Sequence, residues 1–316
     1  MAKEKKYVKV KSEETEGKEG KVSYATDSKG NLHKVEKESA ESRKGRASSK
    51  RIIAVLCWLA AVCFEVLAII RLLGKGILVN AISNDVTFVI ICIAIDLIFA
   101  IIGSLFWKKA NHIDPASSKQ PVKFWINNNL GLFVAIVAFL PLVIFILTNK
   151  DLDKKNKTIL TTVAVAALAI AGLVWVDRNP VSLEDLELDK AKIELVNPDG
   201  IVWVVKDAGS SHKYHLSDDC YHIKNRETEA ITIEEAYERS ITDMCNDCYK
   251  KALKQKGYTS DQIDKILNAT TEEEVESIID GIQLQDDEID EIDENTEVEE
   301  EWEEENLWKL IWELLE

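Results

Sequence analysis

Four long apolar runs dominate the first half of this 316-residue chain. They cover residues 52–70, 87–106, 130–147 and 158–176. Each is close to the ~20 residues that a helix needs to cross the hydrocarbon core of a bilayer. A buried helix of a soluble protein normally keeps a polar stripe at the helical period, and these runs have almost none. The sequence therefore predicts a domain of four transmembrane helices over residues 52–176.

The charge is divided unevenly along the chain. Residues 1–51 carry a net charge of +6, residues 52–176 carry +4, and residues 177–316 carry −26. The formal total of −16 therefore reflects only the C-terminal part. This segregation excludes a uniformly soluble acidic protein, and it also excludes disorder throughout. Residues 1–51, which are rich in Lys, Glu and Ser, are expected to form a disordered charged arm.

Cationic residues beside the apolar runs indicate an orientation. Five Lys or Arg lie within residues 43–51, and four lysines lie in the loop of residues 107–129. Cytoplasmic loops are enriched in Lys and Arg, so we expect a multi-pass plasma-membrane protein with both termini in the cytoplasm. The lysines of residues 150–157 argue against this orientation, although Asp151 and Asp153 lie among them. The first run begins too late for an ordinary cleavable signal, so we interpret it as an uncleaved anchor.

Two acids lie inside the apolar runs, Glu65 in the first and Asp96 in the second. An ionised carboxylate in hydrocarbon is costly, so such residues usually face a partner or a wet cavity. One interpretation is a proton or cation path in an oligomeric transporter or channel. We favour a polar contact between helices, with Arg71 or residues 127–129 as candidate partners, or with one acid kept neutral.

The second half of the chain contains a histidine and cysteine pattern that is typical of a metal site. It reads His-x4-Cys, then 24 residues, then Cys-x2-Cys, and its members are His215, Cys220, Cys245 and Cys248. Two residues between cysteines allow both sulfurs to turn onto one ion. A second pair completes a tetrahedron of three thiolates and one imidazole. Such a closed set predicts a structural Zn²⁺ rather than a catalytic one.

Alternatives to this ligand set stay open. His222 or His212 could replace His215 as the fourth ligand. A Cys-x2-Cys pair can also be a redox pair, although the strand–helix context of thioredoxin-like proteins is lacking here.

Residues 200–256 are expected to fold around the metal. Residues 201–205 are typical of a strand, and residues 212–216 of the strand that returns. Thr232, with Glu235 three residues later, gives the capping pattern that opens a helix. About 50 residues are too few for a robust apolar core, so the metal is expected to hold this module together.

The same segment resembles a known module. Tyr214-His215, Cys220, the Thr-x-Glu-Glu-Ala run within residues 231–236 and the final Cys-x2-Cys resemble a small bacterial zinc-binding domain, similar to the zinc module of Ada-type DNA-repair proteins. The resemblance implies the same four metal ligands. Methyl transfer does not carry over, because the Ada module uses four cysteines and no methyltransferase core follows here. More loosely, four spans followed by this module resemble uncharacterised multi-pass membrane proteins of Gram-positive bacteria.

Three further segments complete the predicted organisation. They are a linker over residues 177–199, a helical hairpin over 257–285 and an acidic tail over 286–316. Residues 257–316 carry a net charge of −21. The tail ends in an apolar helix that could dock on a protein partner, on the membrane or on the chain itself. Its docking candidates are Leu307, Trp308, Leu310, Ile311 and Trp312.

The predicted fold class is an α-helical membrane protein with a small α+β zinc-binding cytosolic domain and a helical to disordered acidic C-terminal tail. The function we expect is that of a non-enzymatic, membrane-anchored interaction or scaffold protein, because no nucleophile–base or paired-carboxylate constellation is visible. The near-neutral module lacks the basic stripe that nucleic-acid binding requires. The expected partners are the lipid bilayer and a protein bound by the zinc module or the tail, with a homo-oligomer as a further option.

Overall fold

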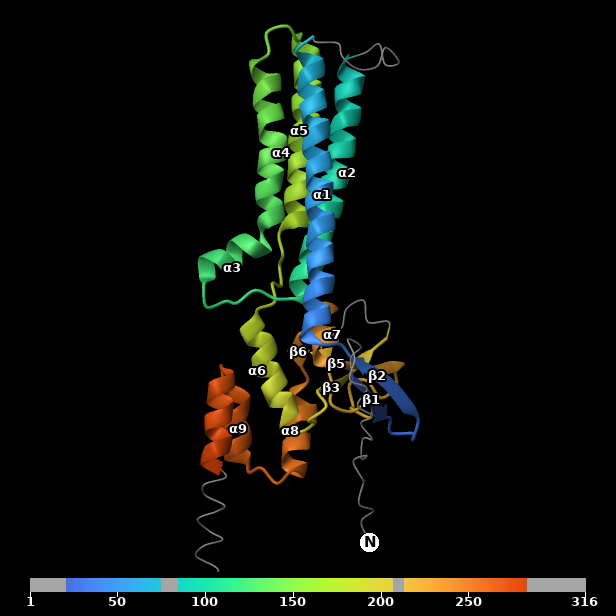
Figure 1. The fold of residues 1–316 in the computed structure, drawn as a ribbon, viewed down its shortest axis with the longest axis vertical. Coiled ribbons are helices and arrows are strands. Elements are labelled where there is room, and N and C mark those ends of the chain that lie inside the picture. Colours follow the sequence, from blue (N-terminus) through green and yellow to red (C-terminus); the bar gives the residue numbers. More distant parts are fainter. Residues whose placement is uncertain (1–20, 75–84, 207–212, 283–316) are drawn as a thin grey trace, which may run out of the picture.

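The computed structural model describes residues 21–74, 85–206 and 213–282. Figure 1 shows an elongated molecule with a bundle of long helices and, at one end, a mixed α/β domain. The bundle helices are α1 (Ala40–Leu72), α2 (Asp85–Ile113), α4 (Leu130–Thr148) and α5 (Lys154–Trp175). Within the described ranges, these four helices are long and apolar enough to cross a membrane. The four apolar runs are thus confirmed as helices of membrane-spanning length.

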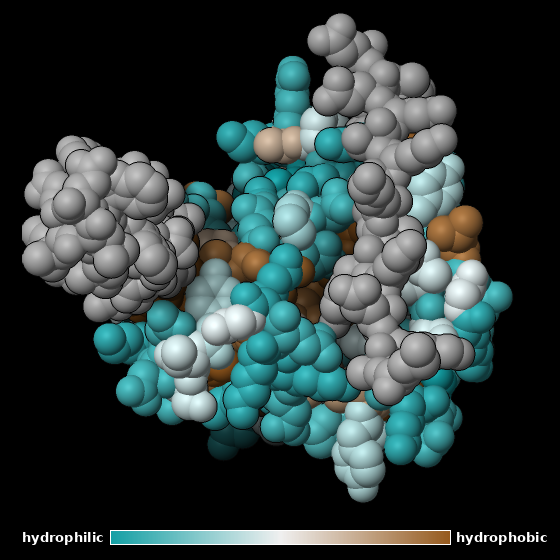
Figure 2. All heavy atoms as spheres, turned by 90° about the horizontal axis from the view of Figure 1, so that it is seen from below, coloured by the Kyte–Doolittle hydropathy of each residue, from teal (hydrophilic) through white to brown (hydrophobic). Residues whose placement is uncertain are grey.

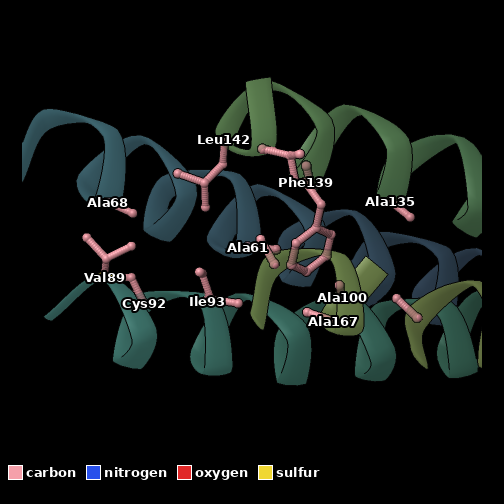
Figure 3. Close-up of a cluster of buried hydrophobic side chains, with 14 of the residues drawn as sticks. Ala61, Ala68, Val89, Cys92, Ile93, Ala100, Ala135, Phe139, Leu142 and Ala167 are labelled. Carbon is pink, nitrogen blue, oxygen red and sulfur yellow. The ribbon is translucent and has the colours of Figure 1, made fainter. Parts of the chain in front are cut away.

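Small residues allow the bundle helices to approach one another closely. Alanines from all four helices are buried in the bundle core: Ala61, Ala68, Ala100, Ala135, Ala138, Ala164, Ala167 and Ala171. Figure 3 shows the Phe139 ring directed from α4 toward the other helices, with Ala61, Ala100 and Ala167 near it. Close packing of this kind drives helix association in a bilayer, where the hydrophobic effect between helices is absent.

The outer sides of the bundle are apolar, whereas the surface of the α/β domain is not. Leu56, Val137 and Leu173 are among the large apolar side chains that the bundle exposes. Seen from the domain end, the described surface is mostly hydrophilic, with scattered apolar patches (Figure 2). This division is what a membrane protein with a water-exposed domain requires.

Residues 21–37 form a β-hairpin, in a region for which the sequence predicted disorder. Its strands are β1 (Lys21–Thr26) and β2 (Leu32–Lys37), which pair antiparallel. The Asp27 carboxylate orders the turn by accepting a hydrogen bond from the backbone N–H of Asn31 at 2.7 Å. Val35 is buried in a cluster with Trp203, and the His33 ring meets Trp203 edge-on at 5.1 Å. Tertiary contacts therefore order a segment whose charge alone suggested disorder.

Helices α1 and α2 also extend beyond the predicted spans. Helix α1 begins at Ala40, inside the predicted disordered arm, because the Ser39 hydroxyl caps it by accepting a hydrogen bond from the Ser42 N–H. The two extensions pack against each other through a buried contact at the domain end. That contact consists of Ala47, Ala110 and Ile113. Both helices thus reach the α/β domain without interruption.

Over its described residues 183–206 and 213–268, the α/β domain combines four short strands with four helices. Its elements are α6 (Leu183–Glu194), β3 (Ile201–Val205), β4 (Lys213–Tyr214), β5 (Thr228–Thr232), α7 (Ile233–Glu238), β6 (Asp243–Met244), α8 (Asn246–Gln255) and α9 (Ser260–Asn268). Strand β3 pairs antiparallel with β5, and β4 pairs parallel with β6. The strand expected over residues 212–216 is shorter: after β4, His215 makes a single bridge to Trp203 of β3. The Thr232 hydroxyl caps α7 by accepting from the Glu235 N–H.

Helix α6 lies where the sequence predicted a linker. Its Leu186 and Ile193 are buried with residues of β3 and α7. The Asp189 carboxylate accepts hydrogen bonds from the hydroxyls of Tyr214 and Tyr237, at 2.8 and 2.6 Å. These partners lie far from α6 in sequence, so local pattern alone did not reveal the helix's place in the domain.

The remaining helices are α3 (Pro121–Asn128) and the helices at the C-terminal end of the described chain. Helix α3 leaves the base of the bundle sideways (Figure 1). At the C-terminal end, a capping box of Thr259 and Gln262 opens α9, and a second helix follows over residues 272–282. Residues 307–312 of the predicted docking segment lie outside the described residues.

Polar contacts fix the α/β domain to the bundle. The Nδ1 atom of His112, near the end of α2, lies 3.3 Å from the Tyr237 carbonyl oxygen, and its Nε2 lies 3.4 Å from Asp177. Arg46 of α1 donates to Glu238 at 2.7 Å. The domain is therefore held by the same two helices that extend from the apolar bundle.

Candidate metal centre

The four predicted ligands meet between β4 and the start of α8. His215 directly follows β4, and Cys220 lies in the turns after it. Cys245 is the N-cap residue of α8, and Cys248 lies in the first turn of that helix. One ligand atom from each of the four residues lies within 4.8 Å of the others. The structure thus brings together the whole set that the sequence spacing suggested.

Two separations can be compared with the edges of a tetrahedral metal site. Metal–sulfur bonds of ~2.3 Å and metal–nitrogen bonds of ~2.0 Å imply edges of about 3.8 Å between sulfurs and about 3.5 Å between sulfur and nitrogen. The sulfurs of Cys220 and Cys245 are 4.0 Å apart. The Cys248 sulfur lies 3.6 Å from Nδ1 of His215. The donor atoms therefore have the spacing of a metal site, and the cysteines are free thiols rather than a disulfide.

Backbone hydrogen bonds hold the ligands in this arrangement. The Trp203 and His215 backbones exchange two hydrogen bonds, at 2.6 and 2.8 Å, which fix His215 to β3. The Cys245 N–H donates to the Tyr214 carbonyl at 3.0 Å, which ties the start of α8 to β4. The Cys220 carbonyl accepts from two later N–H groups in a tight turn. The N-terminus of α8 also favours negative charge on the thiolates beside it.

Burial sets the protonation of the ligands. His215 is 3% exposed, and burial, together with the charges of His222 and Lys213, lowers the pKa of His215 to about 4. Its imidazole is therefore neutral at neutral pH, which is the form that binds metals. Burial, with the adjacent Cys220 and Cys245, raises the pKa of the Cys248 thiol. A cation in the cluster would offset the charge of the thiolates, so metal binding would release protons.

His222 has a different environment from His215. Its Nε2 lies 2.9 Å from the Asp247 carboxylate, and half of its side chain is exposed. His222, Cys245 and Asp247 also come within 4.8 Å of one another, but only Cys245 of these three is buried. The structure thus places His215, and not His222, in the four-residue group, while His212 lies outside the described residues. A solvent-open pocket of about 350 Å³ borders the centre at His222 and Asp247.

The sequence did not reveal the role of Asp189, whose carboxylate binds the residue next to His215. Tyr214, the neighbour of His215, is fully buried, and its hydroxyl donates to Asp189. Burial raises the pKa of Asp189, and the hydroxyls of Tyr237 and Tyr214 act in the opposite direction. Asp189 therefore anchors β4 directly beside a metal ligand. An acidic helix such as α6 gives no sequence signal that one of its carboxylates faces the domain and binds two tyrosine hydroxyls.

The two acids of the bundle are buried in different environments. The Glu65 carboxylate accepts a hydrogen bond from the Leu142 N–H of α4 at 3.2 Å. Neither carboxylate oxygen of Asp96 has a hydrogen-bond partner in the part of the chain that the structure describes. The partners expected from the sequence are engaged elsewhere: Arg71 pairs with Asp85 at 2.7 Å, and the side chain of Asn128 bonds to the end of α2.

Comparisons of the chain with protein-family models, with curated proteins and with solved structures found no match. The resemblance to an Ada-type zinc module therefore depends on the residues of the motif alone. The structure adds that a His/Cys group capable of holding a metal ion lies in a domain joined to four helices of membrane-spanning length.

Proposed function

We propose that the chain is a multi-pass membrane protein whose cytosolic domain is stabilised by one structural Zn²⁺, and that it acts as a membrane-anchored interaction or scaffold protein. The observation that carries this proposal is the spacing of the four donor atoms around a common centre. Three thiolates and one imidazole form a donor set that suits zinc. Four protein ligands leave no open coordination position, which favours a structural role over a catalytic one.

The position of the centre explains why the domain would need a metal. The four ligands come from three separate places: the end of β4, the turns around Cys220 and the start of α8. The apolar residues of the domain form several small clusters rather than one large core. Metal binding that links such clusters contributes directly to the folding free energy of a small domain.

Charge and cysteine chemistry support a cytosolic location for the domain. Residues 43–51 of α1 and lysines near the end of α2 place positive charge at the domain end of the bundle. Such charge is typical of the cytoplasmic side. Free thiols also persist in the reducing cytosol rather than outside the cell.

Helix α3 fits the boundary between membrane and cytosol. Val122 and Trp125 are 71% and 54% exposed, and Trp125 meets Phe133 of α4 edge-on at 5.7 Å. Lys123 lies between them in the sequence. An apolar surface next to a spanning helix, with Trp and Lys on it, is suited to the lipid headgroup region.

The joined helices suit a scaffold. Helix α1 runs from residue 52 back to Ala40, a distance of about 18 Å at 1.5 Å per residue. The ion pair of Arg46 and Glu238 and the contacts of His112 then hold the domain at the end of that extension. A partner bound by the domain or by the C-terminal tail would thus be held near the membrane surface.

Quantitative crosslinking from native membranes tests this function. The full chain is compared with a chain that lacks residues 307–316, with Cys248→Ser, and with the double variant Glu65→Gln/Asp96→Asn. A scaffold predicts that the same proteins are captured by the double variant and lost from the truncated chain or from Cys248→Ser. Unchanged capture by all variants, together with an ion flux in vesicles that the double variant abolishes, would instead favour a transporter or channel.

A further inference from the structure

Asp96 lies near the middle of the bundle without a polar partner. It is 0% exposed, and neither carboxylate oxygen has a hydrogen-bond partner among the described residues. It is eleven residues from the start of α2 at Asp85, which corresponds to about 16 Å along the helix. That depth is close to the centre of a hydrocarbon core about 30 Å thick.

Glu65 of α1 is the acidic group that acts on Asp96 from the neighbouring helix. It is 4% exposed, lies close enough to interact electrostatically with Asp96, and binds the backbone N–H of Leu142. That N–H follows Pro141, the proline inside α4. The two acids thus lie at the junction of α1, α2 and α4.

No cation balances these two acids within the described bundle interior. Among the described residues, Cys92, four residues before Asp96 on α2, also interacts electrostatically with Asp96. Residues 130–148 and 158–175 of α4 and α5 contain no charged residue. At one end of the bundle, Arg71 pairs with Asp85. At the other end, the Lys108 ammonium bonds to the carbonyl oxygens of Val174 and Val176.

A proton on the carboxyl group would remove the need for a counter-ion at Asp96. An ionised carboxylate without a donor or a counter-ion is strongly disfavoured in an apolar interior, and a second carboxylate nearby disfavours it further. A bound metal cation would need several oxygen ligands, whereas the core around these acids is built from alanines and other apolar residues. A proton needs one oxygen only, and it turns the acid into a neutral group that can donate a hydrogen bond.

We propose that Asp96 and Glu65 form a proton-binding site in the centre of the bundle, with Asp96 as the group that holds the proton at neutral pH. The Asp96 carboxylate takes the proton from hydronium, which leaves water, and an O–H bond forms on one carboxyl oxygen. Glu65, on the neighbouring helix α1, favours this proton because a second carboxylate nearby disfavours the ionised form of Asp96. The site is separate from the metal centre and goes beyond the proposed scaffold function.

Infrared spectroscopy of the full-length protein in lipid nanodiscs tests the proposal, because the C=O stretch of a protonated carboxyl is separate from the bands of a carboxylate. We expect this band at neutral pH in the unmodified chain and in the control Asp85→Asn, and its loss in Asp96→Asn. We expect Glu65→Gln to shift the band, since this change alters the neighbour of Asp96. Asn has the shape of the protonated acid, and circular dichroism checks that Asp96→Asn keeps its helices.

Three results would overturn the proposal. The first is a spectrum of the unmodified chain without a protonated carboxyl at neutral pH. The second is a band that Asp96→Asn leaves unchanged, which would place the proton on another group. The third is loss of the band when Na⁺ replaces K⁺ in the buffer, which would identify a cation site instead.

Discussion

In the α/β domain, the half-buried carboxylate of Asp189 accepts hydrogen bonds from two tyrosine hydroxyls, whereas the fully buried carboxylate of Asp96 in the bundle has no hydrogen-bond partner among the described residues. Lys192 is a second example in the domain, because its buried ammonium donates to the carbonyls of Leu267 and Ala269. The domain therefore satisfies its buried polar groups with protein donors and acceptors.

The two regions also differ in what holds them together. The bundle packs through buried alanines and aromatic rings, and this packing involves none of the four metal ligands. The domain has several separate apolar clusters, and the four residues of the His/Cys group come together from different segments of it. Metal removal should thus unfold the domain and leave the bundle intact.

The largest effect is expected from Cys248→Ser. Loss of a ligand would remove most of the zinc-binding free energy, which is about 10–16 kcal/mol for small structural sites. This is comparable to the whole stability of a typical domain, about 5–15 kcal/mol. Limited proteolysis with mass spectrometry should show rapid cleavage within residues 213–256 and a protected bundle. The control Cys63→Ser, outside the domain, should behave like the unmodified chain, and equal digestion of both variants would contradict the account.

A smaller loss is expected from Asp189→Ala. The change leaves the buried Tyr214 hydroxyl without its acceptor and removes one of the two acceptors of the Tyr237 hydroxyl, which keeps the Asp185 carbonyl at 3.1 Å. The cost of the two losses is about 2–5 kcal/mol. Hydrogen exchange should become faster at β4 and α7 but not in α4. The exposed Asp261 provides the control Asp261→Ala, for which we expect no change in exchange. Equal exchange in the two variants would show that the Asp189 contacts do not stabilise the domain.

The variant Gly103→Ala should destabilise the bundle and leave the domain unchanged. A Cβ at Gly103 would lie 2.6 Å from the Trp58 ring, so α1 and α2 would have to separate. Overpacking of this kind costs about 1–3 kcal/mol. Thermal unfolding in detergent should occur at a lower temperature than for the control Gly172→Ala, because a Cβ at Gly172 meets no atom within 4 Å. The metal content should stay unchanged, and loss of metal would show that the two regions are coupled.

The smallest effect on stability is expected from Glu184→Gln, because Glu184 of α6 binds Ser117 and Ser118 in the segment between α2 and α3. Partial burial raises the pKa of Glu184, but hydrogen bonds from Ser117 and Ser118 outweigh it and lower that pKa to about 2. An acid with a lowered pKa stabilises the folded state above its unfolded pKa, and this contribution is lost as the pH falls toward 2. Hydrogen exchange at the start of α6 should be faster in Glu184→Gln at neutral pH, and the difference should vanish on acidification. A difference that persists at low pH would assign the effect to another cause.

The four long apolar helices and the His/Cys group were predictable because local sequence determines both. Runs of apolar residues define the spans, and the spacing of His215, Cys220, Cys245 and Cys248 is a short-range pattern. The limits of the spans were less predictable. Helix α1 extends to Ala40 because Ala47 packs against α2, and this contact depends on residues far apart in sequence.

Long-range packing also explains the segments whose structure the sequence did not reveal. The hairpin of residues 21–37 is charged and is ordered by Val35 and Trp203, which are distant in the chain. Helix α6 depends on the tyrosine hydroxyls that Asp189 meets only in the folded domain. Neither contact has a local pattern in the sequence.

The central claim is that His215 and three cysteines hold one structural zinc ion in the domain. Elemental analysis of the purified full-length protein tests it most directly. We expect about one zinc per chain in the unmodified protein and in His222→Ala, and a clear loss of zinc in Cys248→Ser. A chain without bound metal, or one that loses its zinc in His222→Ala while Cys248→Ser keeps it, would show that these four residues do not form a zinc site.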